Sequence, residues 1–245
     1  MTGGNRLGFG FWRIAFLAAV VGSFGAGGQE AGLADEFEAE YADQVMIADP
    51  LEPLNRVFYT VNDKLYFWLM KPLATGYEKI VPEPGRLGIR NMFDNVAMPK
   101  RFVNCLLQGK MKESGRELGR FGINSTVGIL GWNDPAAERW EIKPQAEDTG
   151  QTLGVWGMDG MMSLTLPVFG PSNVRDTVGF VGDFFLDPLS YLPNLWVRAG
   201  LNAEKRVNNL SLALGEYEKT KDNALDHYLS LRNMYEQYRD RKIGE

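Results

Sequence analysis

The chain has 245 residues, of which 44% are apolar and 23% charged, which is the composition of a folded protein with enough apolar material for a core. Its net charge of −5 and the lack of a clustered basic stripe exclude the electrostatic footprint of a nucleic-acid-binding protein. Its one histidine, His227, and one cysteine, Cys105, are too few for a zinc site of the usual kind or for an intramolecular disulfide. We therefore predict no nucleic-acid partner, no metal and no other cofactor.

The N-terminal segment has the pattern of a secretory signal peptide. Arg6 and Arg13 precede an uncharged apolar run over residues 14–28, which is too short to cross a bilayer comfortably and is followed by small residues. We predict a signal peptide over residues 1–34, with Ala26 as another candidate cleavage site and an uncleaved anchor as the alternative. The chain is therefore expected to be exported.

An acidic flexible leader is predicted over residues 35–48, where carboxylates outnumber large apolar side chains. Asp49 can then cap a helix that starts with Pro50. This helix should be long and amphipathic and should stop near Lys71-Pro72. Its apolar face repeats at steps of three and four residues: Leu54, Val57, Phe58, Val61, Leu65, Trp68 and Leu69.

Shorter helices should follow, because prolines and glycines interrupt the apolar pattern at 81–85, at Pro99 and at Gly109. A helix over about 110–126 carries three glycines on one side, which would allow close approach to a neighbour or a ligand: Gly115, Gly119 and Gly122. Residues 129–135 read as a turn. Thr149 is a candidate cap for a helix that runs to about residue 156.

The stretch from Gly150 to Asp176 departs furthest from an ordinary globular pattern. It holds five glycines and two prolines, yet it is strongly apolar and almost uncharged between Val155 and Val174. Alternation over 162–167 predicts one short extended arm, and 169–172 reads as a turn. An exposed apolar loop would be an aggregation liability in water, so this hairpin is either a buried plug or a loop that handles acyl chains. The pattern leaves both alternatives open.

The helix predicted after Ser172, its candidate cap, is apolar nearly all round from Val174 to Leu186, so it should be buried or face lipid. Residues 195–242 then form one long helical pattern without a proline. A heptad-like seam favours packing on the chain's own domain, with a coiled coil to another chain as the alternative. The seam residues are Val207, Leu210, Leu214, Tyr217, Lys221, Ala224, Tyr228, Leu231, Tyr235 and Tyr238.

No catalytic motif is present. The sequence has no Gly-x-x-x-x-Gly-Lys-Ser/Thr loop, no Gly-x-Ser-x-Gly elbow and no His-Glu-x-x-His pair. Cys105 lies in the apolar run over 102–107, which is typical of a small core residue and not of a nucleophile. We therefore predict that the protein is not an enzyme.

Four segments, in order, resemble the MlaA (VacJ) family, and the resemblance spans about residues 49–193. They are Asp49–Arg56 (DPLEPLNR), Val81–Arg86 (VPEPGR) with Asn91 and Asn95 after it, Arg120–Thr126 (RFGINST), and Gly150–Asp176.

The resemblance implies an all-α protein with a ring-like arrangement of amphipathic helices, lying in the outer membrane of a Gram-negative bacterium. Residues 49–193 would form a helical lipid-channel domain, and residues 194–245 a long C-terminal helix packed on it. Such a protein removes mislocalised phospholipids from the outer leaflet through an amphipathic channel. It associates with trimeric porins and passes the lipid to a soluble periplasmic carrier.

The hairpin that borders the channel corresponds here to residues 157–171. The candidate site residues are Gly157, Met158, Met161, Met162, Leu164, Leu166, Phe169 and Gly170. Many family members are lipoproteins, but no cysteine stands near residues 14–35, so we expect no lipidation and predict attachment through apolar helical surfaces or an uncleaved signal. The alternative from another class is a non-catalytic structural or adaptor protein of the cell envelope that acts through its C-terminal helix.

Overall fold

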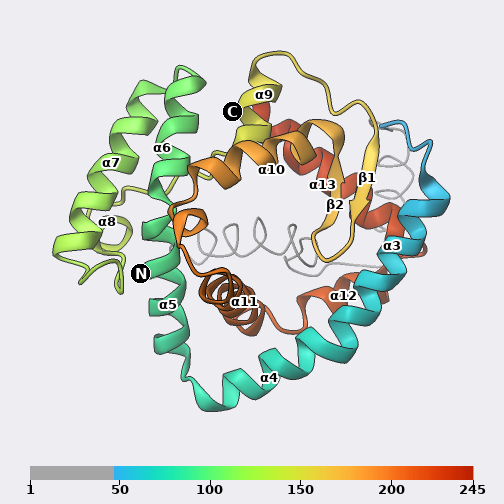
Figure 1. The fold of residues 1–245 in the computed structure, drawn as a ribbon, viewed down its shortest axis with the longest axis horizontal. Helices are drawn as coiled ribbons and strands as arrows, with labels where there is room; N and C mark the ends of the chain where they lie inside the picture. Colours follow the sequence, from blue (N-terminus) through green and yellow to red (C-terminus); the bar gives the residue numbers. More distant parts are fainter. Residues whose placement is uncertain (1–46, 245) are drawn as a thin grey trace, which may run out of the picture. The chain divides into compact units, whose positions relative to one another are not determined.

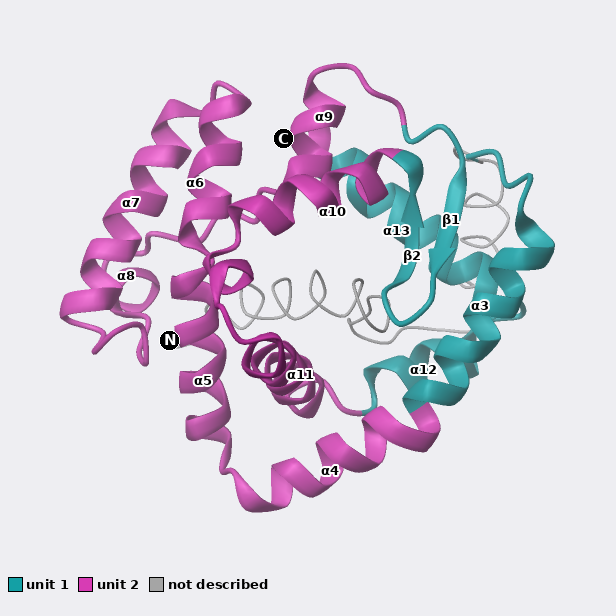
Figure 2. Ribbon diagram, viewed as in Figure 1, with its two compact units in different colours: residues 1–66, 160–174, 215–242 teal, residues 67–159, 175–214, 243–245 magenta. Residues whose placement is uncertain are grey.

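The computed structural model describes residues 47–244, so the predicted signal peptide and nearly all of the predicted acidic leader lie outside the described residues. The described chain is mostly helical with one two-stranded hairpin, which confirms the all-α prediction. It forms two compact units, coloured separately in Figure 2, and each is described by itself. Within residues 47–244, no helix is long and apolar enough to cross a membrane.

Unit 1 draws on three separate parts of the chain, residues 47–66, 160–174 and 215–242. Its main helix, α3 (Glu52–Leu65), packs on the hairpin formed by β1 (Ser163–Leu166) and β2 (Gly170–Asn173) (Figure 1). The strands are antiparallel, and Leu164 lies opposite Ser172. The remaining helices of the unit are α12 (Glu216–Asn223) and most of α13 (His227–Gly244).

Helical structure continues through Lys71-Pro72, so the predicted stop there is wrong. A π-helical turn, Tyr66–Met70, follows α3 and leads directly into α4 (Lys71–Ile80). Proline lacks an N–H group and its ring clashes with the carbonyl one turn back in a regular α-helix. The wider π turn just before Pro72 relieves this conflict, because its hydrogen bonds reach five residues back instead of four.

Unit 2 holds the other helices of the described chain. Within it, α6 packs on α7, and α11 packs on both α4 and α5. Asp148, and not Thr149, caps α9, because its carboxylate accepts a hydrogen bond from the Gln151 N–H at 2.8 Å. The bounds are α5 (Glu83–Val96), α6 (Met98–Leu107), α7 (Met111–Thr126), α8 (Pro135–Glu138), α9 (Thr149–Val155), α10 (Val174–Leu186), a 3₁₀ turn (Pro188–Tyr191) and α11 (Leu195–Ser211). Ser172 lies in β2, so it does not cap α10.

The single long C-terminal helix is also corrected, because the tail consists of three helices, α11, α12 and α13. α11 ends at Ser211, Gly215 directly before α12 has φ of +85°, and Ala224 is extended and ends α12. A glycine in a helical pattern costs only about 1 kcal/mol, so apolar spacing alone does not reveal a left-handed break. Several seam residues are buried within unit 1: Tyr217, Tyr228, Leu231 and Tyr235.

His227 is buried in unit 1, where the Tyr59 hydroxyl lies 2.7 Å from its Nδ1 and the Tyr217 ring packs edge-on. Burial, reinforced by the nearby Lys221 ammonium, lowers its pKa from 6.5 to about 4. Between these values the histidine is protonated only in the unfolded chain, so stability should fall as the pH drops through this window, by up to about 3 kcal/mol. Denaturant unfolding of the full chain and of His227→Asn at several pH values tests this. The slope should be weaker in the variant, and equal slopes would contradict the assignment.

Candidate functional site

Helix α7 buries its polar face and exposes its apolar face. Ser114, Glu117, Arg120 and Asn124 follow one another at steps of three and four residues and are all at least 95% buried. The helix exposes the apolar side chains of Met111, Leu118 and Phe121, and Val127, directly after its last residue, is also exposed. A helix at the surface of a water-soluble protein has the reverse orientation, because burial of the apolar stripe is what holds it in place.

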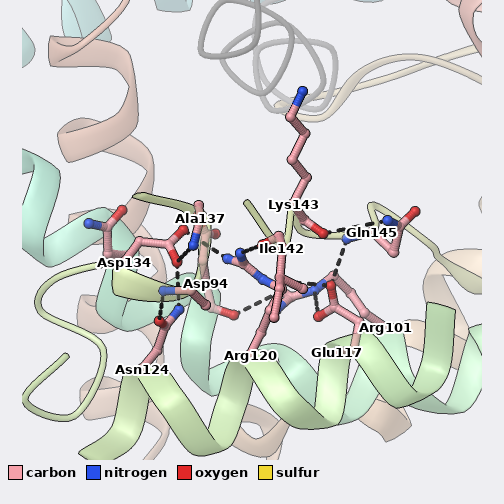
Figure 3. Close-up of polar contacts among 12 residues, drawn as sticks. Asp94, Arg101, Glu117, Arg120, Asn124, Asp134, Ala137, Ile142, Lys143 and Gln145 are labelled. Atoms are coloured by element: carbon pink, nitrogen blue, oxygen red, sulfur yellow. Dashed lines mark hydrogen bonds and ion pairs between the residues drawn. The ribbon is translucent and has the colours of Figure 1, made fainter. Parts of the chain in front are cut away.

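Three of the buried polar side chains of α7, Glu117, Arg120 and Asn124, pair with groups from other segments of unit 2, as Figure 3 shows. Glu117 accepts a hydrogen bond from Nε of Arg101 at 2.7 Å, and Arg120 pairs with Asp134 at 2.8 Å. Asn124 also donates to Asp134, at 2.8 Å. Because each buried charge has an opposite charge within hydrogen-bond distance, the interior of this part of unit 2 can be polar without leaving a lone ion.

Two further helices repeat this reversal. In α3, Asn55 is 2% exposed, whereas Leu54, Val57 and Val61 are each about half exposed. In α10, the buried residues are Arg175, Asp176 and Gly179, and the exposed ones are Val178, Phe180, Val181, Phe184 and Phe185. The nearly all-apolar helix therefore points its large side chains outward.

The predicted close approach of a neighbouring segment to the glycine face of α7 is wrong for the described residues, and close approach of a ligand stays a prediction. Gly115, Gly119 and Gly122 are exposed, and a Cβ atom added to any of them would meet nothing within 4 Å. These glycines lie on the outward, apolar side of the helix together with Leu118. The absence of side chains there flattens the exposed face and brings no neighbouring segment of the described chain closer.

The hairpin has its arms at β1 and β2, so the arm predicted over 162–167 is confirmed for residues 163–166, whereas Pro167 belongs to the turn and 169–172 is mostly strand. The turn lies at residues 167–169, because Val168 and Gly170 have positive φ angles of 71° and 86°. Ser163 and Thr165 are buried, while Leu164 and Leu166 on the other side are half-buried. The tip exposes Val168 and Phe169.

The eight predicted site residues fall in both units. Gly157, with φ of +92°, and the half-buried Met158 follow α9 in unit 2. The other six belong to unit 1 and lie on the hairpin or directly before it. Among these, Met161 is 63% exposed with φ of +65°, and Met162 forms a bridge with Ala48.

Two asparagines of α3 hold the hairpin, and sequence reasoning missed their role. Asn55 donates to the Ser163 carbonyl at 3.1 Å and accepts from the Thr165 N–H at 2.8 Å. Asn62, two helical turns later, donates to the Leu166 carbonyl at 2.9 Å and accepts from the Val168 N–H at 2.6 Å. Each side-chain amide therefore pairs with a strand edge as a neighbouring strand would. We call this pair the asparagine clasp. Its signal in the sequence is two amides seven residues apart on an amphipathic helix.

Asp49 holds the Asn55 side chain of the asparagine clasp in position. Its carboxylate accepts hydrogen bonds from Asn55 at 2.8 Å, Tyr228 at 2.5 Å and Arg232 at 3.2 Å. Burial and the hydrogen bond to this carboxylate raise the pKa of the Tyr228 hydroxyl, which keeps the phenol neutral and donating. A small pocket of unit 1 borders the hairpin here and is lined by Tyr59, Asn62, Tyr66, Thr165, Gly170, Pro171, Tyr217, Tyr228, Leu231 and Arg232.

Helices that expose apolar side chains over a polar, hydrogen-bonded interior define a helical protein whose surface meets lipid or a partner, because exposed apolar patches mark such interfaces. The chain belongs to the MlaA lipoprotein family, whose profile matches residues 47–242. This family is one of transport lipoproteins, so the prediction that the protein is not an enzyme is confirmed.

Relatives and a solved structure agree with this assignment. The chain is 29% identical over 209 residues to the intermembrane phospholipid transport system lipoprotein MlaA of Escherichia coli K12, covering 81% of this chain and 79% of that protein. It is 28% identical over 200 residues to an uncharacterized protein of Rickettsia conorii, with 81% and 79% coverage. A structure described as "Structural basis for maintenance of bacterial outer membrane lipid asymmetry" is similar at a TM-score of 0.71 and 28% identity. The match covers 80% of this chain and 99% of that one.

Proposed function

We propose that this chain is an outer-membrane component of intermembrane phospholipid transport that removes mislocalised phospholipids from the outer leaflet. The outward apolar faces of α3, α7 and α10 carry this proposal, since they suit contact with lipid in a chain whose relatives are named for phospholipid transport. Burying such surface in lipid stabilises the bound state by roughly 25 cal/mol per Å². Its partners would be phospholipid, a trimeric porin and a soluble periplasmic lipid carrier.

The hairpin would border the lipid path. Its half-buried Leu164 and Leu166 and its exposed Phe169 offer apolar contacts to acyl chains, and Met158, Met161 and Met162 add flexible apolar side chains near its base. Gly157 and Gly170 have positive φ and allow the backbone to turn at the two ends of this segment. The polar side, Ser163 and Thr165, is held by the asparagine clasp.

Replacement Leu164→Asp should abolish phospholipid that copurifies with the protein and leave helical content unchanged. A carboxylate would stand where acyl chains pass, and an ionised group is costly to bring into an apolar contact. The measurement is lipid mass spectrometry of the full chain extracted in mild detergent, with circular dichroism of the same sample. Leu225→Asp is the matched control, because Leu225 is 93% exposed between α12 and α13 and should keep its lipid.

Two results would refute this role. If Leu164→Asp unfolds the protein, the hairpin is ordinary core. If the folded variant keeps both its lipid and outer-leaflet clearance in cells, the hairpin has no contact with the transported lipid. The adaptor alternative has no specific observation in its favour, because much of the seam that would pair with a partner is buried within unit 1.

A further inference from the structure

The turn between α7 and α8, residues 127–132, presents a group of bulky apolar side chains, and we call it the apolar turn. Ile129 and Leu130 are 67% and 68% exposed, and Val127 and Trp132 are 52% and 40% exposed. No charged residue occurs in the segment. The sequence predicted a turn over 129–135, but it did not predict that the turn exposes large apolar side chains.

The backbone of the apolar turn is held in a conformation that its residues disfavour. Ile129 and Leu130 are consecutive and have φ angles of 57° and 56°. Bulky residues rarely occupy this left-handed region, and β-branched residues are genuine outliers there. A chain that only had to reverse direction would be more stable with glycine or asparagine at these positions. The exposure of the Ile129 and Leu130 side chains is therefore accompanied by backbone strain.

Hydrogen bonds hold the backbone of the apolar turn in this conformation. The Gly131 N–H donates to the Asn124 carbonyl at 2.8 Å, and the Asn133 N–H donates to the Gly128 carbonyl at 2.9 Å. Asn124 is in turn tied to Asp134, which also pairs with Arg120 (Figure 3). The apolar turn is therefore linked by hydrogen bonds to the buried polar side chains of α7, which we call the polar spine: Ser114, Glu117, Arg120 and Asn124.

The same hydrogen bonds identify lipid as the favoured occupant. Six of the seven N–H groups of residues 127–133, all except that of Ile129, donate to backbone carbonyls within the segment 123–129. Water can satisfy the polar groups of an exposed turn, whereas a backbone that enters lipid must satisfy them within the protein. Leu118 and Phe121 of α7, the helix that precedes the apolar turn, are also exposed. Trp132 supplies an aromatic ring of the kind enriched at membrane interfaces.

We propose that the apolar turn is a membrane-insertion site, whose Ile129 and Leu130 enter the acyl layer and hold unit 2 at the bilayer. The inference rests on the membrane association in the proposed function and adds the segment that performs it. The polar spine holds the strained backbone in place, so the side chains of Ile129 and Leu130 project outward before the protein meets the membrane. Little ordering of the turn is therefore required on insertion.

The test is the binding of the detergent-purified full chain, after detergent removal, to vesicles of phosphatidylethanolamine and phosphatidylglycerol, measured by flotation. The double variant Ile129→Asn with Leu130→Asn should bind at least about tenfold more weakly, because apolar contact is lost. Asparagine tolerates the left-handed conformation, so the variant should fold at least as well as the parent. Ile129→Gly with Leu130→Gly should behave alike. Leu225→Asn removes an exposed leucine elsewhere and should bind like the parent.

A depth measurement gives a second readout. A fluorophore on Leu130→Cys should be quenched more strongly by lipids spin-labelled on the acyl chain than one on Glu138→Cys, which lies in α8 and is exposed. Cys105 is fully buried, and burial raises its pKa to about 12, so it should not compete for the label.

The outcomes separate the two proposals. Unchanged vesicle binding by both double variants, or equal quenching at residues 130 and 138, overturns the insertion site and shows that the turn faces water or another protein. Failure of the parent chain itself to bind vesicles overturns the membrane association of the proposed function. Weaker binding with stability unchanged or increased supports insertion, because a purely structural turn would not lose membrane affinity when its strain is relieved.

Discussion

Glu117→Ala should destabilise unit 2 by about 3–5 kcal/mol, the largest effect we expect from a single substitution in this chain. Glu117 is fully buried, with one carboxylate oxygen 2.7 Å from Nε of Arg101 and the other 2.6 Å from the Gln145 backbone nitrogen. Its removal leaves Arg101 buried without this countercharge and Gln145 without this acceptor, and uncompensated burial dominates the cost. Urea unfolding in detergent, followed by circular dichroism, would measure it.

Glu113→Ala is the matched control for this substitution. Glu113 lies one turn earlier in α7, its side chain is 30% exposed, and its nearest ion-pair partner, Arg116, is 3.9 Å away. Its loss should cost less than about 0.5 kcal/mol. Replacing Glu117 and Arg101 together by methionine should cost clearly less than the sum of the two single changes, because no buried charge of this pair remains. Equal effects of the Glu117 and Glu113 variants would show that the polar spine contributes nothing to stability.

Opening the asparagine clasp should have the second-largest effect. Asn55→Ala removes the partners of the Ser163 carbonyl and the Thr165 N–H, two buried backbone groups, at a cost of about 2–4 kcal/mol. Hydrogen exchange should accelerate at the Thr165 amide in this variant and at the Val168 amide in Asn62→Ala. If the clasp positions the hairpin on the lipid path, transfer of bound phospholipid to an acceptor should slow by at least about tenfold in the double variant.

Thr60→Ala provides the control for the clasp. Thr60 lies between the two asparagines in α3 but is exposed, and its hydroxyl donates only to the Arg56 carbonyl one turn back. This variant should keep the parent's amide protection, stability and transfer rate. Fast lipid transfer by the double asparagine variant, with hairpin amides that exchange rapidly, would show that the hairpin moves freely without consequence and would remove it from the transport path.

The helical class, many of the breaks between helices, the extended arm of the hairpin and the family could be predicted from the amino-acid sequence. Each of these depends on local chemistry or on ordered motifs. Glycine ends a helix at residue 109, and the alternation over 162–167 predicts the strand that β1 forms. The left-handed break at Gly215 was not predicted, because the heptad-like seam continues in register across it.

Which side of each helix faces outward could not be predicted from the sequence and is seen in the folded structure. The pattern of α7 is equally amphipathic with Leu118 inside or outside, since periodicity reports that two faces differ and not which solvent each one meets. The choice depended on distant partners that pair the polar face, such as Arg101 and Asp134 with Glu117 and Arg120. The asparagine clasp likewise joins residues more than one hundred positions apart. The periodicity of a segment does not report which distant segment it will pair with, so hydrogen bonds of this kind are seen only in the folded structure.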